Sequence, residues 1–212
     1  MKILGVHKGA TEVLIAVNVM IYVLEWAEEA RWWLYRNLAL QAIKVFVKPW
    51  TLVTSMFIHN WGDFHNHIVF NMIALFFFGL YLERLIGEKK FLKVYFIGGF
   101  FASVCYVATS LLLGIPSVKT MSMGASGAIF AVMGALLVLR PNMKVLLYFF
   151  IPMPLYLLAI FYVIYSVPAM FAGVGNIAHN AHLGGLLAGY LFGKHYKSTV
   201  PRERDTHGYR FY

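Results

Sequence analysis

Charged residues are scarce in this chain: Asp, Glu, Lys and Arg make up only 13% of its 212 residues, about half the share found in soluble domains. Hydrophobic residues make up 60%. A disordered chain needs the opposite composition, with low hydrophobicity and high charge. Because the apolar residues exceed what one small core can bury, lipid is their natural solvent. The composition therefore predicts a polytopic membrane protein.

Cysteine and acidic residues are also scarce. Cys105 is the only cysteine, so no intramolecular disulfide can hold the fold. No Asp or Glu occurs from Lys89 to Arg202, so this stretch cannot supply the acidic member of a Ser-His-Asp triad. In a soluble protein, the net charge of +9 would favour a nucleic-acid partner. Here we expect no nucleic-acid partner, and we use the positions of the positive residues to predict the membrane topology.

Runs of about 17 to 25 apolar residues are long enough to cross a bilayer as helices. Glycine, proline or charged residues separate the runs. We therefore predict an all-α, six-transmembrane-helix bundle that forms a single membrane domain over residues 1–212. The six runs lie near 11–27, 65–86, 91–113, 123–139, 145–167 and 177–193.

The distribution of Lys and Arg orients these helices. With a cytoplasmic N-terminus, 13 of the 18 Lys and Arg residues fall on the cytoplasmic side, so the positive-inside rule predicts that both termini are cytoplasmic. The residues 194–212 then form a basic cytoplasmic tail. The loop at 28–63 contains or adjoins all five tryptophans, and we expect it to lie in the outer membrane interface. We expect the membrane to be the cell membrane of a prokaryote.

A few polar side chains lie inside the apolar runs, where lipid makes them costly and where they are candidates for function. His67 and Asn71 lie four apart in the second run and share one helical face. Ser126 opens the fourth run, and His179 and His182 open the sixth. The topology puts all of them in the outer half of the bilayer, so residues from three helices can meet at one depth.

Ser126 and His182 make the most specific pair. The first N–H groups of the Ser126 helix have no intrahelical acceptor and can stabilise an oxyanion. Small residues in both helices let them approach closely, which brings a serine nucleophile to a histidine base. Phe130, one turn beyond Ser126, can stack on the imidazole. The small residues are Gly127, Ala131 and Gly134 in the fourth run and Gly185 and Gly189 in the sixth.

Other interpretations remain open. The glycines can serve helix packing alone, and His179 is a competing base. His59 and His65 can be interfacial or can help to bind a substrate or a metal. A histidine cluster can hold a metal in a transporter, and a protein of the same fold can bind membrane proteins without cutting them.

The combined pattern resembles the rhomboid family of intramembrane serine proteases, over residues 11 to 193. Two departures are Thr51 after Trp50, where the family often has Trp-Arg, and Phe130, where it commonly has Tyr. The matching motifs are His67-x-x-x-Asn71, Gly124-x-Ser126-Gly127 and Ala181-His182-x-x-Gly185-x-x-x-Gly189, together with Glu83, Gly87 and Gly134.

The resemblance implies an intramembrane serine endopeptidase that cuts transmembrane protein substrates in or near the bilayer. Ser126 would be the nucleophile and His182 the general base. The side chains of His67 and Asn71 and the Ser126 backbone N–H would form the oxyanion hole, with Gly124 supporting it. No cofactor and no metal are expected.

The fifth run contains Pro152 and Pro154, which weaken helical hydrogen bonding and predict a kink. A kinked, mobile fifth helix could open sideways to admit a substrate helix. This gate hypothesis depends on the proline pair alone, and a static kink is the alternative.

Overall fold

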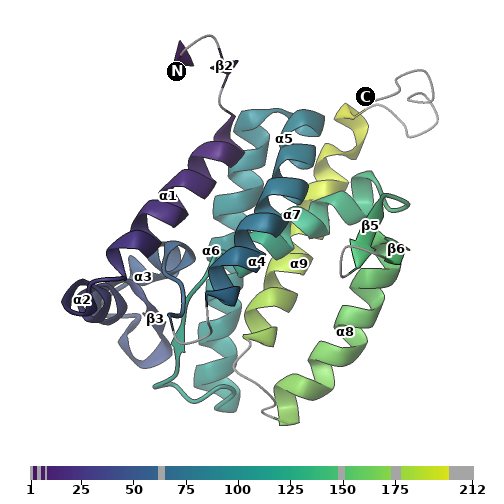
Figure 1. The fold of residues 1–212 in the computed structure, drawn as a ribbon. Coiled ribbons are helices and arrows are strands. Elements are labelled where there is room, and N and C mark those ends of the chain that lie inside the picture. The colour runs from purple at the N-terminus through teal and green to yellow at the C-terminus, as the bar shows by residue number, and fades with distance from the viewer. Residues whose placement is uncertain are drawn as a thin grey trace.

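The computed structural model describes residues 2–3, 6–7, 9–61, 65–147, 151–172 and 178–200. Helices make up most of this part of the chain (Figure 1). The longer helices are α1 (Ala10–Leu24), α2 (Glu28–Leu38), α6 (Glu88–Leu113), α7 (Ser126–Leu139), α8 (Leu155–Ala172) and α9 (His179–Tyr196). A further helical stretch, Asn66–Ile86, consists of α4 (Asn66–Ala74), the π-helical turn η3 (Leu75–Gly79) and α5 (Leu80–Ile86).

Three helices among the described residues are long and apolar enough to cross a membrane: Asn66–Ile86, Glu88–Leu113 and Leu155–Ala172. The helices α1 and α7 are apolar but shorter. Large apolar side chains point away from the bundle, for example those of Phe77, Leu112 and Ile164. In water such a surface would be unstable, whereas in lipid it is solvated. The chain is therefore a multi-pass membrane protein.

The fifth predicted helix, 145–167, is wrong at 145–147 and 151–154, in its N-terminal part. Residues Lys144–Leu147 (β5) and Ile151–Pro154 (β6) form an antiparallel hairpin, and α8 begins only at Leu155. Pro152 and Pro154 explain the difference, because proline lacks the N–H of a helical bond and disfavours helix in the residue before it. The proline pair therefore precedes α8 instead of kinking it, which removes the basis of the gate hypothesis.

The predicted interfacial loop 28–63 contains regular structure. After α2 come β3 (Leu40–Gln41), η1 (Ala42–Lys44), α3 (Thr51–Thr54) and η2 (Ser55–Phe57). The strand β3 pairs antiparallel with β4 (Met121–Ser122), which precedes α7. The Trp50 indole N–H donates to the Asn37 carbonyl at 2.8 Å. The strand pairing ties the loop to the segment that leads into α7, and the Trp50 bond holds two parts of the loop together.

Short elements of regular structure precede the first predicted helix and follow the last one. The short strands β1 (Lys2–Ile3) and β2 (Val6–His7) pair before α1. At the other end, α9 continues to Tyr196 and is followed by η4 (Lys197–Thr199). The last twelve residues of the predicted basic tail, 201–212, lie outside the described residues.

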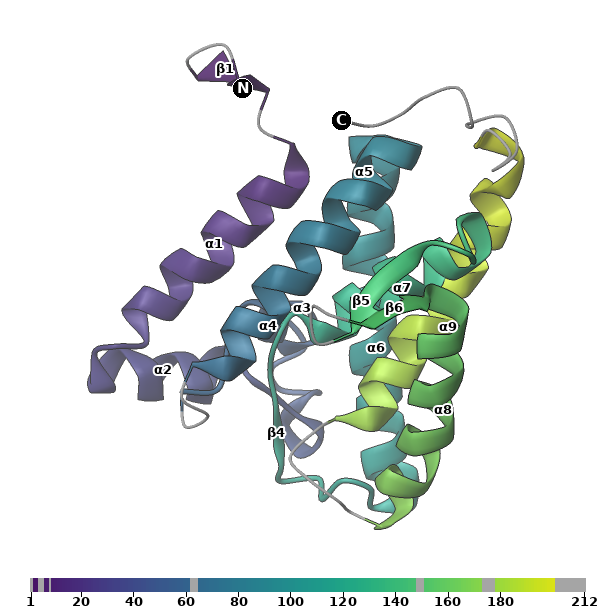
Figure 2. The same cartoon turned by 45° about the vertical axis from the view of Figure 1, so that its right-hand side comes forward.

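The helix α7 is the centre of the bundle. It packs against α6 and α9, and α8 lies at the edge with α9 as its main helical neighbour (Figures 1 and 2). The residues of α7 that face these neighbours are fully buried, among them Ala131, Val132 and Leu136. Ser126 is therefore the first residue of the central helix of the bundle.

Candidate active site

Ser126 and His182 meet where α7 and α9 begin. Ser126 is the first residue of α7, and His182 lies in the first turn of α9. The Ser126 Oγ lies 2.6 Å from the His182 Nε2, which is a short hydrogen bond. A hydrogen bond between a serine hydroxyl and an imidazole is an arrangement that can activate serine as a nucleophile. The Nδ1 of the competing histidine, His179, lies 3.2 Å from the Ser166 Oγ instead.

Glycines permit the close approach of α7 and α9. A Cβ atom at Gly185 would overlap the Gly127 carbonyl oxygen, and one at Gly189 would overlap the Ala131 carbonyl oxygen. On the facing helix, a Cβ at Gly134 would overlap the Leu186 carbonyl oxygen. Cβ atoms essentially never come this close to backbone. The distance between the two helices, and with it the contact between Ser126 and His182, therefore requires glycine at these positions.

Two aromatic rings hold the imidazole of His182. The Phe130 ring stacks on it, with the ring centroids 4.4 Å apart and the planes 12° from parallel. The Tyr162 hydroxyl of α8 lies 2.7 Å from the His182 Nδ1. Sequence reasoning missed Tyr162, because no spacing in the fifth run distinguishes it from Tyr156 or Tyr165. Only the packing of α8 on α9 identifies it.

His67, Asn71 and Gly124 form a second group of candidate residues, which lines the same cavity as Ser126. The Asn71 amide donates to the His67 carbonyl at 2.7 Å, and the Asn60 backbone N–H donates to the His67 Nδ1 at 3.1 Å. Gly124 has φ +118°, a conformation that side chains rarely adopt, and a Cβ there would lie 2.6 Å from the His67 Nε2. Gly124 therefore makes room for the His67 ring two residues before Ser126.

One cavity joins these residues. Its volume is about 1110 Å³, and Ser126, His182, His67, Asn71 and Gly124 all line it. Polar groups that converge on a large cavity within an apolar bundle are typical of an active site. The cavity holds the candidate nucleophile, the candidate base and the candidate oxyanion donors at one end of the bundle.

Two further histidines that the sequence analysis singled out, His59 and His65, pack against other side chains. His59 is fully buried, its backbone N–H donates to the Glu25 carboxylate at 3.1 Å, and its ring lies 5.2 Å from that of His67. Burial lowers the pKa of His59 to about 3, so the ring is neutral. His65 hydrogen-bonds Tyr22, and its ring contacts Trp61 edge-on.

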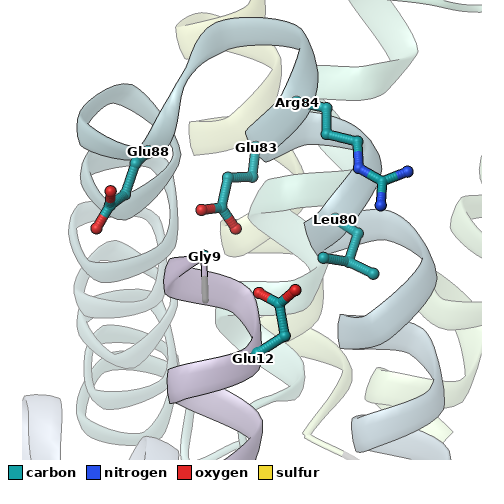
Figure 3. Close-up of a pocket in the computed structure, with 6 residues that line it drawn as sticks. All are labelled: Gly9, Glu12, Leu80, Glu83, Arg84 and Glu88. Atoms are coloured by element: carbon teal, nitrogen blue, oxygen red, sulfur yellow. The ribbon is translucent and has the colours of Figure 1, made fainter. Parts of the chain in front are cut away.

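No metal centre is visible in the described part of the chain, where no group of three or more His, Cys, Asp or Glu residues is arranged to hold an ion. Acidic side chains do gather around a separate cavity, lined in part by Glu12, Glu83 and Glu88 (Figure 3). The Glu83 carboxylate accepts the backbone N–H groups of Ala10 and Thr11 at 2.7 and 2.9 Å. This carboxylate therefore caps α1, as its negative charge at a helix N-terminus favours.

Comparison with known proteins gives several relatives. The chain is 38% identical to "RHOMBOID-like protein 12, mitochondrial" of Arabidopsis thaliana over 64% of this chain and 43% of that protein. It is 30% identical to "Rhomboid protein 1, mitochondrial" of Saccharomyces cerevisiae over 93% and 56%. It is 34% identical to "Rhomboid protease GluP" of Bacillus subtilis over 67% and 25%. The chain thus spans about half or less of the length of these relatives.

The prediction of a prokaryotic cell membrane is wrong, because the plant and yeast relatives are named as mitochondrial proteins. The error has a physical reason. Hydropathy and the positions of Lys and Arg report that helices cross lipid and in which direction, but they do not report which membrane the protein enters.

The family model for the Rhomboid domain matches residues 47–198. This range contains every residue that we assign to the candidate site, from His67 to Gly189. The match also covers well over half of the chain. The chain therefore belongs to the rhomboid family.

Proposed function

We propose that this protein is a serine endopeptidase that hydrolyses peptide bonds in or near transmembrane segments of other membrane proteins. The observation that carries the proposal is the 2.6 Å contact between Ser126 Oγ and His182 Nε2 inside a membrane bundle. A histidine within hydrogen-bond reach of a serine hydroxyl is the arrangement that activates serine as a nucleophile. Relatives named "Rhomboid protease GluP" and "Rhomboid protease AarA" support the same activity.

In the proposed reaction, the Ser126 oxygen attacks the carbonyl carbon of the scissile peptide bond while the His182 Nε2 accepts the hydroxyl proton. The tetrahedral intermediate carries a negative oxygen. The Ser126 backbone N–H, in the open first turn of α7, and the side chains of His67 and Asn71 then stabilise this oxygen. The protonated His182 gives its proton to the leaving amine, and water hydrolyses the remaining ester by the same steps.

We propose that six helical stretches cross the membrane and that both termini lie on one side, the side with the excess of Lys and Arg. These stretches are α1, Asn66–Ile86, α6, α7, α8 and α9. At 1.5 Å per residue, the 14 residues of α7 span about 21 Å, less than the roughly 30 Å of a bilayer's hydrocarbon core. One end of α7 is therefore recessed, and the cavity beside Ser126 can bring water to that end.

We further propose a mitochondrial membrane as the location, from the names of the yeast and plant relatives. Fractionation of cells that express the tagged protein tests this directly. Recovery in a mitochondrial membrane fraction supports the proposal, and recovery in other membranes contradicts it.

The activity is tested with detergent-purified protein and a transmembrane protein substrate, with cleavage followed on gels. We expect Ser126→Ala and His182→Ala to abolish cleavage while both variants still fold. Ser103→Ala is the matched control, because Ser103 is a buried serine of α6 that lines the same cavity, and it should cut like the wild type. Cleavage that survives Ser126→Ala would refute the proposal. A wild type that binds the substrate without cutting it would favour the non-catalytic alternative.

A further inference from the structure

A row of polar contacts extends from the candidate dyad into α8. The Tyr162 hydroxyl lies 2.7 Å from the His182 Nδ1, and Ser166 interacts with Tyr162 from one helical turn further along α8. The Ser166 Oγ lies 3.2 Å from the His179 Nδ1. These side chains therefore form a row that runs from Ser126 through His182, Tyr162 and Ser166 to His179.

The spacing of these residues explains how two helices build the row. Tyr162 and Ser166 lie four apart on α8, and His179 and His182 lie three apart on α9, so each pair shares one helical face. The two faces meet where α8 packs against α9 (Figures 1 and 2). Ser166 is 0% exposed and His179 is 3% exposed. Water therefore does not compete with these two side chains for their hydrogen bonds.

We propose that Tyr162, with Ser166 and His179 behind it, is an uncharged relay that holds His182 in the tautomer required of a general base. The inference rests on the proposed function, because it assigns the relay a role toward the Ser126–His182 dyad. In a Ser-His-Asp triad an acidic residue has this positioning role. Here the stretch 89–202, which supplies α7, α8 and α9, contains no acidic residue.

The direction of each hydrogen bond follows from the chemistry of the base. To accept the Ser126 proton, His182 must be unprotonated at Nε2 and carry its proton on Nδ1. The Nδ1–H then donates to the Tyr162 oxygen, and the Tyr162 O–H donates to the Ser166 oxygen. The Ser166 O–H in turn donates to the His179 Nδ1. All four groups are neutral, and each of the three donors within the row has an acceptor, whereas the His179 Nε2–H at the far end of the row has no partner among the described residues.

The reverse order would put a proton on His182 Nε2 and stop it from acting as a base. It would also fail during the reaction, because the imidazolium form of His182 has no acceptor at Nδ1 for a donating tyrosine. Only the forward order stabilises the positive charge that forms on His182 when Ser126 attacks. Tyr162 therefore acts as a positioning residue.

The test is Tyr162→Phe, which removes one hydroxyl and keeps the ring. Tyr156→Phe is the matched control, because Tyr156 is an exposed tyrosine of the same helix. One neutral hydrogen bond corresponds to roughly a 3- to 10-fold change in rate. We expect kcat to fall by about this factor with KM unchanged in Tyr162→Phe, and neither constant to change in Tyr156→Phe.

Two further measurements separate positioning from general damage. Nitrogen NMR of histidine-labelled protein, with the His182 signals identified by their loss in His182→Asn, should show the proton on Nδ1 in the wild type and a shift toward Nε2 in Tyr162→Phe. Ser166→Ala should also lower kcat, and the double variant should lose little more than the worse single variant, because both residues belong to one row.

The outcomes distinguish the two proposals. A wild type that does not cleave, or cleavage that survives Ser126→Ala, refutes the proposed function. A wild type that cleaves through Ser126, with Tyr162→Phe unchanged in kcat and in the His182 tautomer, refutes only the relay. Additive losses in the double variant also contradict a single connected row.

Discussion

Substitution of Gly189 by alanine tests how closely the helix approach controls the site. A Cβ at Gly193 would lie 2.7 Å from the Ala135 carbonyl oxygen, and those at Gly185 and Gly189 would lie progressively closer to the oxygens that they meet. Ordinary contact begins at 3.4 Å. Alanine at Gly193 therefore requires a shift of about 0.7 Å, and alanine at Gly189 requires more than twice that shift.

The shift has two consequences. Separation of α9 from α7 by more than 1 Å stretches the 2.6 Å bond between Ser126 and His182 beyond hydrogen-bond range, and a misplacement of about 1 Å can reduce catalysis by about 100-fold. Overpacking of a tight core also lowers the free energy of unfolding by about 1 to 3 kcal/mol. We therefore expect Gly189→Ala to lose nearly all cleavage and to melt at a lower temperature.

The assay compares three alanine variants by cleavage rate and by melting temperature in detergent. The loss of stability should rank Gly189 first, Gly185 second and Gly193 third, in the order of the overlaps. Leu187→Ala is the control, because Leu187 is an exposed residue of α9, and it should change little. Wild-type stability and cleavage in Gly189→Ala, or a larger effect at Gly193 than at Gly189, would refute the reasoning.

Three further predictions follow from single contacts. Glu83→Ala should lower the free energy of unfolding by about 2 kcal/mol, since it removes a charged cap of α1. Glu88 is an exposed carboxylate beside the same cavity, and Glu88→Ala should lower that free energy by less than about 1 kcal/mol. Equal effects of the two substitutions would contradict the cap. The pKa of His59 is lowered from 6.5 to about 3, so the fold is fully stable with respect to this group above pH 6.5 and loses stability as the pH falls toward 3. The melting temperature should fall over this window, and it should fall less in His59→Leu. Parallel curves for the two proteins would contradict a role of His59. Phe130→Leu should lower kcat by about 2- to 10-fold, since stacking of this kind contributes about 0.5 to 1.5 kcal/mol; an unchanged rate would show that the stacking is dispensable.

Apolar runs indicated where most helices lie, because lipid requires backbone hydrogen bonds to be made within each segment. The fifth run misled, since hydropathy does not distinguish an apolar hairpin from a helix and since Pro152 and Pro154 lie in the strand before α8 instead of inside a kinked helix. The pairing of Ser126 with His182 was predictable from glycine spacing, because glycine marks the face where helices come closest.

Tyr162 could not be found in the same way. Its role depends on the rotation of α8 against α9, and that rotation leaves no trace in a run where nearly every residue is apolar or aromatic. The regular structure within the loop 28–63 was also unpredictable, because the pairing of β3 with β4 joins residues about 80 positions apart in the sequence.

The central claim is that Ser126 is an activated nucleophile. Reaction of the purified protein with a fluorophosphonate, followed by mass spectrometry of its peptides, tests this claim most directly. We predict that the label is found on Ser126, that it disappears in Ser126→Ala, and that it is strongly reduced in His182→Ala. Labelling that is absent from the folded wild type, or that persists unchanged in Ser126→Ala, would contradict the account.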